Sequence, residues 1–250
     1  MSLSGTWLAA LSGGVFLATW AGTWAVLPWL RRLGAVDTPN DRSSHARPIP
    51  TGGGVVPVLA ICGAWVAAIW VSGLAFDPVA VGIVVAVALA LSLVSWADDL
   101  RGLAPSTRLL AHFLAAGVGV LALPGPVFQG LLPLWADAAL AALLWVWFIN
   151  LFNFMDGIDG IACAEAIAAG VGIALVAVLS QMGAAPVVLG MTVAAAAAAF
   201  LLWNWQPAKV FLGDAGAVPL GFLLGWVLLV LAAAGQWAPA VILPLVFVAD

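Results

Sequence analysis

Four polar clusters interrupt an otherwise apolar chain. The richest is the run Asn150-Leu-Phe-Asn153-Phe-Met-Asp156-Gly157-Ile158-Asp159-Gly160. Ionised carboxylates beside a membrane core are costly, so they usually hold an ion, a proton or a substrate. Asp156 and Asp159 share one face if the segment is helical, and Asn150, Asn153 and Gly157 add hydrogen-bonding groups and backbone access for a ligand. The run is predicted to carry chemistry, and the alternative is an Asp-Gly turn that joins two helices.

Two shorter clusters add carboxylates. The first is Asp98-Asp99, in which adjacent negative charges repel unless a divalent cation or a basic group lies near them. The second is Asp214 in Phe211-Leu-Gly-Asp-Ala-Gly. Each can instead be a solvated helix cap. As a group, these acids suit Mg²⁺, which prefers hard oxygen ligands and keeps waters or substrate phosphates in its other positions.

The fourth cluster is basic and rich in glycine. Arg42, His45 and Arg47 precede Gly52-Gly53-Gly54. Arginine binds phosphate oxygens bidentately, and a glycine-rich turn before a helix can expose backbone amides to an anion. Contact with anionic lipid headgroups is the alternative for the arginines, and His45 can be an ordinary loop histidine.

The elements that position these clusters follow from composition. The 250 residues are 65% hydrophobic and 7% charged, with a mean hydropathy of +1.19. An ordinary globular protein has about a quarter of its residues charged, so the composition excludes that class. Cys62 and Cys163 lie in apolar segments and indicate neither a disulfide framework nor a paired-cysteine metal site. We expect an all-α, polytopic membrane helix bundle in a lipid bilayer, with no nucleic-acid partner.

About nine membrane-spanning helices are predicted from apolar segments bounded by Gly, Pro, Asn and Asp. Their expected bounds are 5–30, 55–75, 79–97, 108–124, 136–152, 161–180, 186–203, 218–234 and 238 to the end. Since the last segment is too short to span comfortably, we expect one integral membrane domain over 1–250 that is incomplete at its C-terminal end.

The basic residues sort to one side of this arrangement. All seven fall in the first, third and seventh loops: Arg31, Arg32, Arg42, Arg47, Arg101, Arg108 and Lys209. By the positive-inside rule these loops are cytoplasmic, which puts the N-terminus outside. The four polar clusters lie in loops of the same side, so we expect them to form one cytoplasm-facing surface.

The order of the four motifs resembles the polyprenyl-phosphate N-acetylhexosamine-1-phosphate transferase family (glycosyltransferase family 4). Its relatives include phospho-MurNAc-pentapeptide translocase and undecaprenyl-phosphate GlcNAc-1-phosphate transferase. The resemblance implies a Mg²⁺-dependent enzyme, with Mn²⁺ as an alternative metal, in the bacterial inner membrane. Undecaprenyl phosphate would attack a UDP-N-acetylhexosamine, release UMP and begin a lipid-linked cell-surface glycan. The Arg-Ser-Ser-His form of the first loop favours the O-antigen (lipopolysaccharide) branch.

The resemblance also implies a role for each motif residue. Asp98, Asp99, Asp156 and Asp159 would be catalytic, and Asp99 and Asp214 would bind the metal. The substrate-binding residues would be Arg42, His45, Arg47, Asn150, Asn153, Gly157 and Phe211. Family members continue into a His- and Arg-rich cytoplasmic loop beyond the position of Asp250. The resemblance therefore implies that this domain lacks its C-terminal cytoplasmic loop and final helix, either as a fragment or as a copy without part of the site.

Two other classes remain open at this point. Membrane-embedded acids also occur in ion- or proton-coupled transporters, although those place acids near the bilayer midplane and often show repeated halves. CDP-alcohol phosphotransferases use Asp-Gly-rich sites, but Ile161-Ala162 follows Gly160 where they have an Ala-Arg pair. Association as a homodimer is also open.

Overall fold

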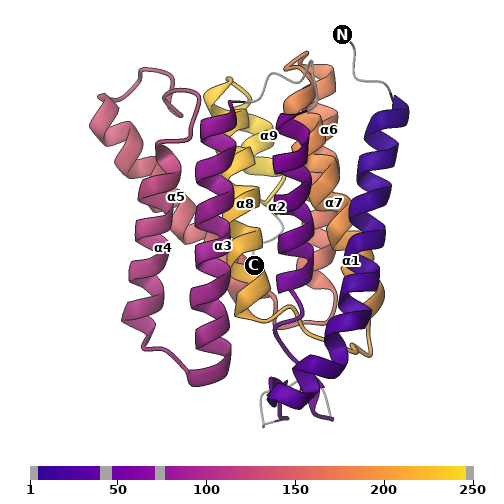
Figure 1. The fold of residues 1–250 in the computed structure, drawn as a ribbon. Coiled ribbons are helices and arrows are strands. Elements are labelled where there is room, and N and C mark those ends of the chain that lie inside the picture. Colours follow the sequence, from indigo (N-terminus) through magenta and orange to yellow (C-terminus); the bar gives the residue numbers. More distant parts are fainter. Residues whose placement is uncertain (1–4, 40–46, 71–76, 246–250) are drawn as a thin grey trace.

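The computed structural model describes residues 5–39, 47–70 and 77–245 of the chain. Within these ranges the chain forms a bundle of α-helices that run roughly side by side, with a single pair of very short strands (Figure 1). The helices are α1 (Gly5–Leu33), α2 (Val55–Ile69), α3 (Pro78–Arg101), α4 (Pro105–Val120), α5 (Leu134–Met155), α6 (Ile161–Leu179), α7 (Ala184–Asn204), α8 (Asp214–Ala233) and α9 (Trp237–Ile242).

The predicted all-α membrane bundle is confirmed, and the predicted number of spans is not. Nine helices occur in the described ranges, close to the expected positions, and six of them are long and apolar enough to cross a membrane. The other three are α2, α4 and α9, with 15, 16 and 6 residues. A helix needs about 20 apolar residues to span a bilayer. The protein is therefore a multi-pass membrane protein with at least six candidate spans among the described residues.

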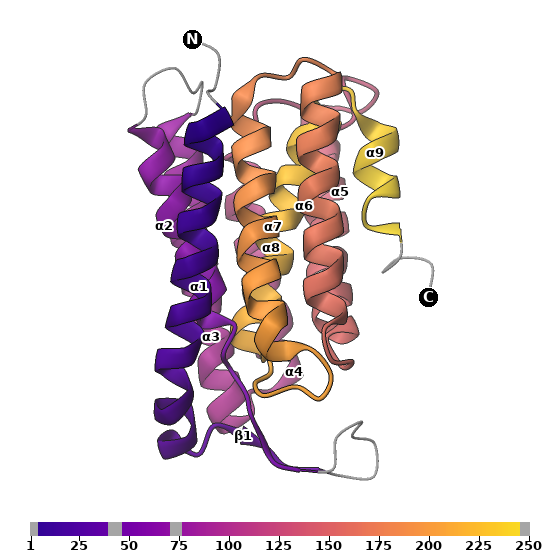
Figure 2. The same cartoon turned by 90° about the vertical axis from the view of Figure 1, so that its right-hand side faces the viewer.

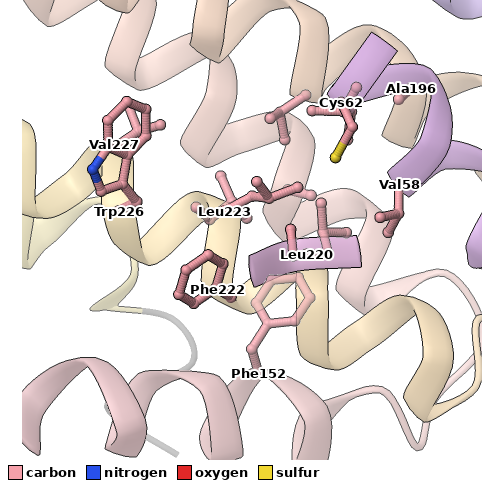
Figure 3. Packing of buried hydrophobic residues seen from close by; sticks show 14 of the residues in the cluster. Val58, Cys62, Phe152, Ala196, Leu220, Phe222, Leu223, Trp226 and Val227 are labelled. Carbon is pink, nitrogen blue, oxygen red and sulfur yellow. The ribbon is translucent and has the colours of Figure 1, made fainter. Parts of the chain in front are cut away.

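The helix α8 lies at the centre of the bundle. Of its most apolar 18-residue window, 89% is buried. Figure 3 shows Phe222 of α8 beside Phe152 of α5, and side chains of α2 on another side of the same helix. Trp145 of α5 stacks on Phe222 with ring centroids 4.6 Å apart and donates its indole N–H to the Phe222 carbonyl. Because its neighbours hold it on several sides, α8 is a rigid support for the residue at its start, Asp214.

The bounds of α3 follow from local sequence. Asp77 caps the helix by accepting the amides of Val79 and Ala80, and Pro78 occupies the first turn, where no amide partner is needed. At the other end Gly102 adopts φ +66° and donates its amide to the Asp98 carbonyl. A left-handed residue of this kind is a common helix stop. The helix thus ends directly after Asp98 and Asp99.

The polar clusters lie at one end of the bundle. The α1–α2, α3–α4, α5–α6 and α7–α8 connections meet at the bottom of Figures 1 and 2, and the described basic residues lie in or beside them. Strands β1 (Val36–Asp37) and β2 (Ile49–Pro50) pair antiparallel in the first connection. The sequence did not predict this hairpin, which brings the first connection back across the end of the bundle.

Two glycines let α2 and α8 touch through their backbones. A Cβ atom on Gly54 would lie 2.4 Å from the Cα of Gly216, and a Cβ on Gly216 would lie equally close to Gly54. No real side chain fits at that distance. The start of α2 therefore lies directly against the first turn of α8.

Candidate active site

Three carboxylates and one arginine meet at the end of the bundle. Asp98 and Asp99 come from the last turn of α3, and Asp214 is the first residue of α8. Arg108, on the first turn of α4, places Nη1 3.2 Å from Asp98 Oδ2 and 3.5 Å from Asp214 Oδ2. Its positive charge offsets the repulsion between acids from separate helices.

Asp99 fixes the start of α8. Its two carboxylate oxygens accept the backbone amides of Asp214 and Ala215, each at 3.1 Å. These amides belong to the first turn of a helix, which has no intrahelical acceptor for them and carries a partial positive charge. The predicted alternative, in which Asp214 caps its own helix, is wrong, because Asp99 supplies the cap from α3.

The Asn150–Gly160 run leaves α5 and turns into α6. Met155 is the last helical residue of α5, and residues 156–160 form the turn, so the predicted shared helical face for Asp156 and Asp159 is wrong. Burial raises the pKa of the Asp156 carboxyl well above its usual range, and the nearby charges of Asp214 and Asp99 raise it further. The turn alternative describes the local backbone correctly, and the turn nonetheless carries Asp156 to the acids of α3 and α8.

One cavity opens beside this cluster, between α3, α4, α5 and α8. It measures about 530 Å³. Its polar lining includes Asp98, Arg108, Asp214, Asn150 and Asn153. Most of the remaining lining is apolar: Leu91, Val94, Leu109, Ala111, Trp147, Leu151, Phe154 and Val218. We call this space the amphipathic cavity.

A second cavity opens on the other side of the same run. It measures about 840 Å³ and lies between the β1–β2 hairpin, the end of α1 and the α7–α8 connection. Three basic residues line it, namely Arg31, Arg47 and Lys209, together with Asp159. We call this space the basic cavity. The Asn150–Gly160 run therefore contributes residues to two cavities of different chemistry.

Two side chains tie the run to the α7–α8 connection. Asn204, which is 2% exposed, accepts the Gly160 amide at 2.9 Å and donates to the Val210 carbonyl at 3.1 Å. Asp159 Oδ2 accepts the Ala208 amide at 2.9 Å. The Gly160–Asn204 and Ala208–Asp159 bonds join positions 44 and 49 apart, and they fix the run against the α7–α8 connection.

The structure places most of the predicted residues at this end of the bundle. Asp98, Asp99, Asn153, Asp156 and Asp214 lie together. Asn150 is exposed on the amphipathic cavity, and Arg47 lies on the basic one. Gly157 is exposed, and a Cβ atom there would lie in ordinary contact, 3.8 Å, with the Phe154 carbonyl oxygen. Arg42 and His45 lie outside the described residues.

The glycine-rich first loop has a different use from the one predicted. The Gly53 amide donates to the Phe211 carbonyl at 3.0 Å, and the Gly54 amide donates to the Leu212 carbonyl at 2.9 Å. The prediction that these amides face an anion is wrong, since they join the first loop to the α7–α8 connection. Phe211 is thereby held half-buried next to the hairpin, with its own amide donating to the Pro50 carbonyl.

Three polar residues of the site were missed by sequence reasoning. Arg108 was predicted only as a loop charge. Asn204, one position past the predicted 186–203 segment, and His112 were not considered. His112 is 5% exposed and lines the amphipathic cavity one turn above Arg108. The i, i+4 spacing of Arg108 and His112 was a usable signal, because it puts both on one face of α4.

The donor set can be compared with the needs of Mg²⁺. In the part of the chain that the structure describes, no group of three or more His, Cys, Asp or Glu side chains is arranged to hold a metal ion. Mg²⁺ is commonly bound by one or two carboxylates together with waters and substrate phosphates, so a full protein cage is not required. The hard oxygens of Asp99 and Asp214 are chemically suited to such a site.

Comparison with known proteins gives a consistent family. Residues 81–232 match the family model described as glycosyl transferase family 4. The decaprenyl-phosphate N-acetylglucosaminephosphotransferase of Mycobacterium tuberculosis (strain CDC 1551 / Oshkosh) is 31% identical over 83% of this chain and 56% of its own length.

Two other relatives have different sugars in their names. The phospho-N-acetylmuramoyl-pentapeptide-transferase of Synechococcus sp. (strain RCC307) is 32% identical over 82% of this chain and 62% of its own length. A probable undecaprenyl-phosphate N-acetylglucosaminyl 1-phosphate transferase of Bacillus subtilis (strain 168) is 27% identical over 76% of this chain and 54% of its own length. The chain thus spans little more than half the length of most of these curated relatives.

Proposed function

Because the chain belongs to glycosyl transferase family 4, we propose that it transfers a sugar 1-phosphate from a UDP-N-acetylhexosamine to a polyprenyl phosphate. A phosphate oxygen of the acceptor forms a bond to the β-phosphorus of the donor, and the bond between that phosphorus and the bridging oxygen breaks. UMP leaves and a polyprenyl diphosphate sugar remains. Undecaprenyl phosphate is the acceptor that we favour, and the product would start a lipid-linked cell-surface glycan.

A single observation carries this proposal. The Asn150–Gly160 run contributes Asn150 and Asn153 to the amphipathic cavity and Asp159 to the basic cavity. Asp156, between these residues in the sequence, lies close to Asp99 and Asp214. A transfer between two phosphate compounds needs both to approach one point, each from its own side. The two cavities offer two such approaches.

The amphipathic cavity is suited to the acceptor. A polyprenyl phosphate has a charged head and an apolar chain, and this cavity has Arg108 and Asn153 at one part of its wall and Leu91, Trp147 and Val218 at another. The head would lie next to Asp98 and Asp214, and the isoprene units would lie along the apolar side chains of helices embedded in the bilayer.

The basic cavity is suited to the nucleotide. Arg31, Arg47 and Lys209 can neutralise a diphosphate, and arginine binds phosphate oxygens bidentately. Phe211, in the connection that carries Lys209, offers a ring on which a base can stack. Asn204 and Asp159 keep this connection at a fixed position relative to the acids.

A divalent cation is part of the proposal. Asp214 and Asp99 would hold Mg²⁺, or Mn²⁺ in its place, and the ion would neutralise charge that develops on the transferring phosphate. Asp98 and Asp156 would lie near the attacking oxygen. The sorting of Lys and Arg to this end of the bundle favours a cytoplasmic active site in a bacterial inner membrane, with the N-terminus outside.

Three finer predictions stay open. They are the identity of the hexosamine, the O-antigen branch and a homodimer. The proposed activity itself does not depend on them.

Release of UMP tests the proposal. Purified protein in detergent is supplied with UDP-N-acetylglucosamine labelled in the sugar, undecaprenyl phosphate and Mg²⁺. We expect UMP and a labelled lipid in equal amounts, and neither when the acceptor is omitted or EDTA is added. UMP without labelled lipid would indicate hydrolysis instead, and no UMP from UDP-N-acetylglucosamine or related UDP-N-acetylhexosamines would contradict the proposal for this chain.

A transporter is the main competing class. Its acids are expected near the middle of the spans, whereas the described aspartates lie at helix ends and in loops. Accumulation of a substrate inside liposomes without UMP release would favour the transporter.

A further inference from the structure

Arg108 contacts two acids through one corner of its guanidinium. A single nitrogen, Nη1, lies 3.2 Å from Asp98 and 3.5 Å from Asp214. A guanidinium has five N–H donors in a planar fork, and a phosphate uses two of them at once. The two ion pairs therefore engage a small part of the binding capacity of this side chain.

The acids are fixed, and the arginine is at the surface. The Asp98 side chain is 7% exposed, and its Oδ1 accepts the Leu103 amide at 2.5 Å. Asp214 is held at the start of α8, whose first amides bond to Asp99. The Arg108 side chain is 41% exposed on a flexible stem. Among these groups, the guanidinium is the one that can move without disturbing helix packing.

We propose that Arg108 and a divalent cation compete for Asp214, and that the phosphate of the acceptor relieves the competition by binding the guanidinium. This inference rests on the proposed function, since Asp214 is the carboxylate that we assign to the metal. Two cations that share one carboxylate repel each other, so Arg108 weakens metal binding as long as it faces Asp214. An acceptor phosphate in the amphipathic cavity offers Arg108 a bidentate partner, and the carboxylate then becomes available to the metal.

A coupling between two ligands follows from this exchange. The acceptor strengthens metal binding, and by thermodynamic reciprocity the metal strengthens acceptor binding by the same factor. Arg108 is thus a positioning residue that selects for an acceptor that ends in a phosphate. A direct bond between metal and phosphate would add to the coupling but would not require Arg108.

Binding of Mn²⁺ measures the competition without any turnover. The free ion is titrated by electron paramagnetic resonance with the purified full chain in detergent, first without substrates. We expect Arg108→Gln to bind Mn²⁺ about three- to tenfold more tightly than the original protein, because a neighbouring positive charge is gone. Arg101→Gln is the matched control: it removes the same charge from an exposed residue at the end of α3 and is expected to change the affinity less than about twofold.

The acceptor supplies the second half of the test. Undecaprenyl phosphate is expected to tighten Mn²⁺ binding about tenfold in the original protein and clearly less in Arg108→Gln. The acceptor KM should rise about tenfold in Arg108→Gln, while the donor KM should stay within about twofold. Arg108→Lys keeps the charge and loses the fork, so its Mn²⁺ affinity should stay near the original value while its acceptor KM rises.

The outcomes separate this inference from the proposed function. Unchanged or weaker Mn²⁺ binding in Arg108→Gln would overturn it, provided that the thermal midpoint in detergent shows a folded protein. If Arg108→Gln does not fold, Arg108→Lys decides, and an unchanged acceptor KM there overturns the inference. Competition between Arg108 and Mn²⁺ without any UMP release would support the proposed exchange at Arg108 and refute the transferase activity. UMP release without such competition would support the transferase activity and refute the exchange.

Discussion

The two ends of the bundle use aspartate in different ways. At the end of the bundle where α3 and α5 begin, the top of Figure 1, the acids bond locally. Asp77 caps α3, and Asp137 of α5 accepts the amides of Val127 and Phe128 at 2.9 and 2.8 Å. These acids bond to backbone within ten positions of themselves. At the other end, Asp99 and Asp159 bond to backbone 49 to 116 positions away, and Asp98 and Asp214 share Arg108. A locally bonded acid stabilises its own loop, whereas the distant contacts assemble a site from four loops.

Burial alone does not distinguish the two kinds of acid. Asp137 is 4% exposed and Asp98 is 8% exposed, so both are buried. The contacts found for the Asp137 carboxylate are nevertheless with the loop that precedes its own helix. The useful criterion is how far apart in the sequence a carboxylate and its bonding partners lie. It assigns Asp137 to stability and Asp99, Asp159 and Asp214 to function. Asp98 has partners nearby in the sequence, Leu103 and Arg108, and is assigned to function because it shares Arg108 with Asp214. Both assignments can be broken by substitution.

The largest expected effect is on activity, from Asp214→Asn. The change removes the charge that we assign to the metal and keeps the size of the side chain, so we expect UMP release to fall by about 10²- to 10⁴-fold. The thermal midpoint should fall little, because one of several mutually repelling carboxylates is removed. UMP release at the original rate would remove Asp214 from the proposed metal site.

Asp137→Asn should show the opposite pattern. An amide oxygen can accept one of the two backbone amides, and the other is left buried without a partner at a cost of about 1–3 kcal/mol. We expect a lower thermal midpoint in detergent and an unchanged rate of UMP release per folded molecule. A large loss of activity with no loss of stability would show that the end with Asp77 and Asp137 takes part in function.

The smallest expected effect is the change in stability caused by Asp156→Asn, and the direction of this change is what the measurement must determine. Because the pKa of this carboxyl is raised in the fold, the folded state binds a proton more tightly than the unfolded chain does. Its contribution to stability is therefore lost as the pH rises from the ordinary carboxyl range toward the raised pKa. Asp156→Asn should raise stability at pH 8 in the presence of EDTA by about 1 kcal/mol, seen as a higher thermal midpoint. A lower midpoint would mean that Asp156 is held as a structural acid, like Asp137.

Much of the bundle could be predicted from the sequence, because helix positions depend on local apolar runs and on their breaks. The expected segment 161–180 corresponds to α6 at Ile161–Leu179, and 55–75 begins where α2 begins. The end of α2 at Ile69 could not be read from an apolar stretch that continues past it. For the same reason the number of spans was predicted less well than the position of each helix.

The sequence predicted many of the residues that form the site, but it did not predict the contacts between them. Charge sorting brought the acidic clusters to one side, and the structure brings Asp98, Asp99 and Asp214 together there. The pairing of Arg108 with two of them depends on how α4 packs beside α3, which no local pattern encodes. The β1–β2 hairpin and the bonds of Gly53 and Gly54 to the α7–α8 connection were missed for the same reason.

The contact between Gly54 and Gly216 has a mechanical consequence. Where Gly54 and Gly216 meet backbone against backbone, neither residue has a side chain that could rearrange and absorb a displacement. Any movement of the hairpin at the basic cavity is then transmitted to Asp214 as a rigid shift. A spectroscopic label on the hairpin would serve as a remote reporter of where that carboxylate stands during turnover.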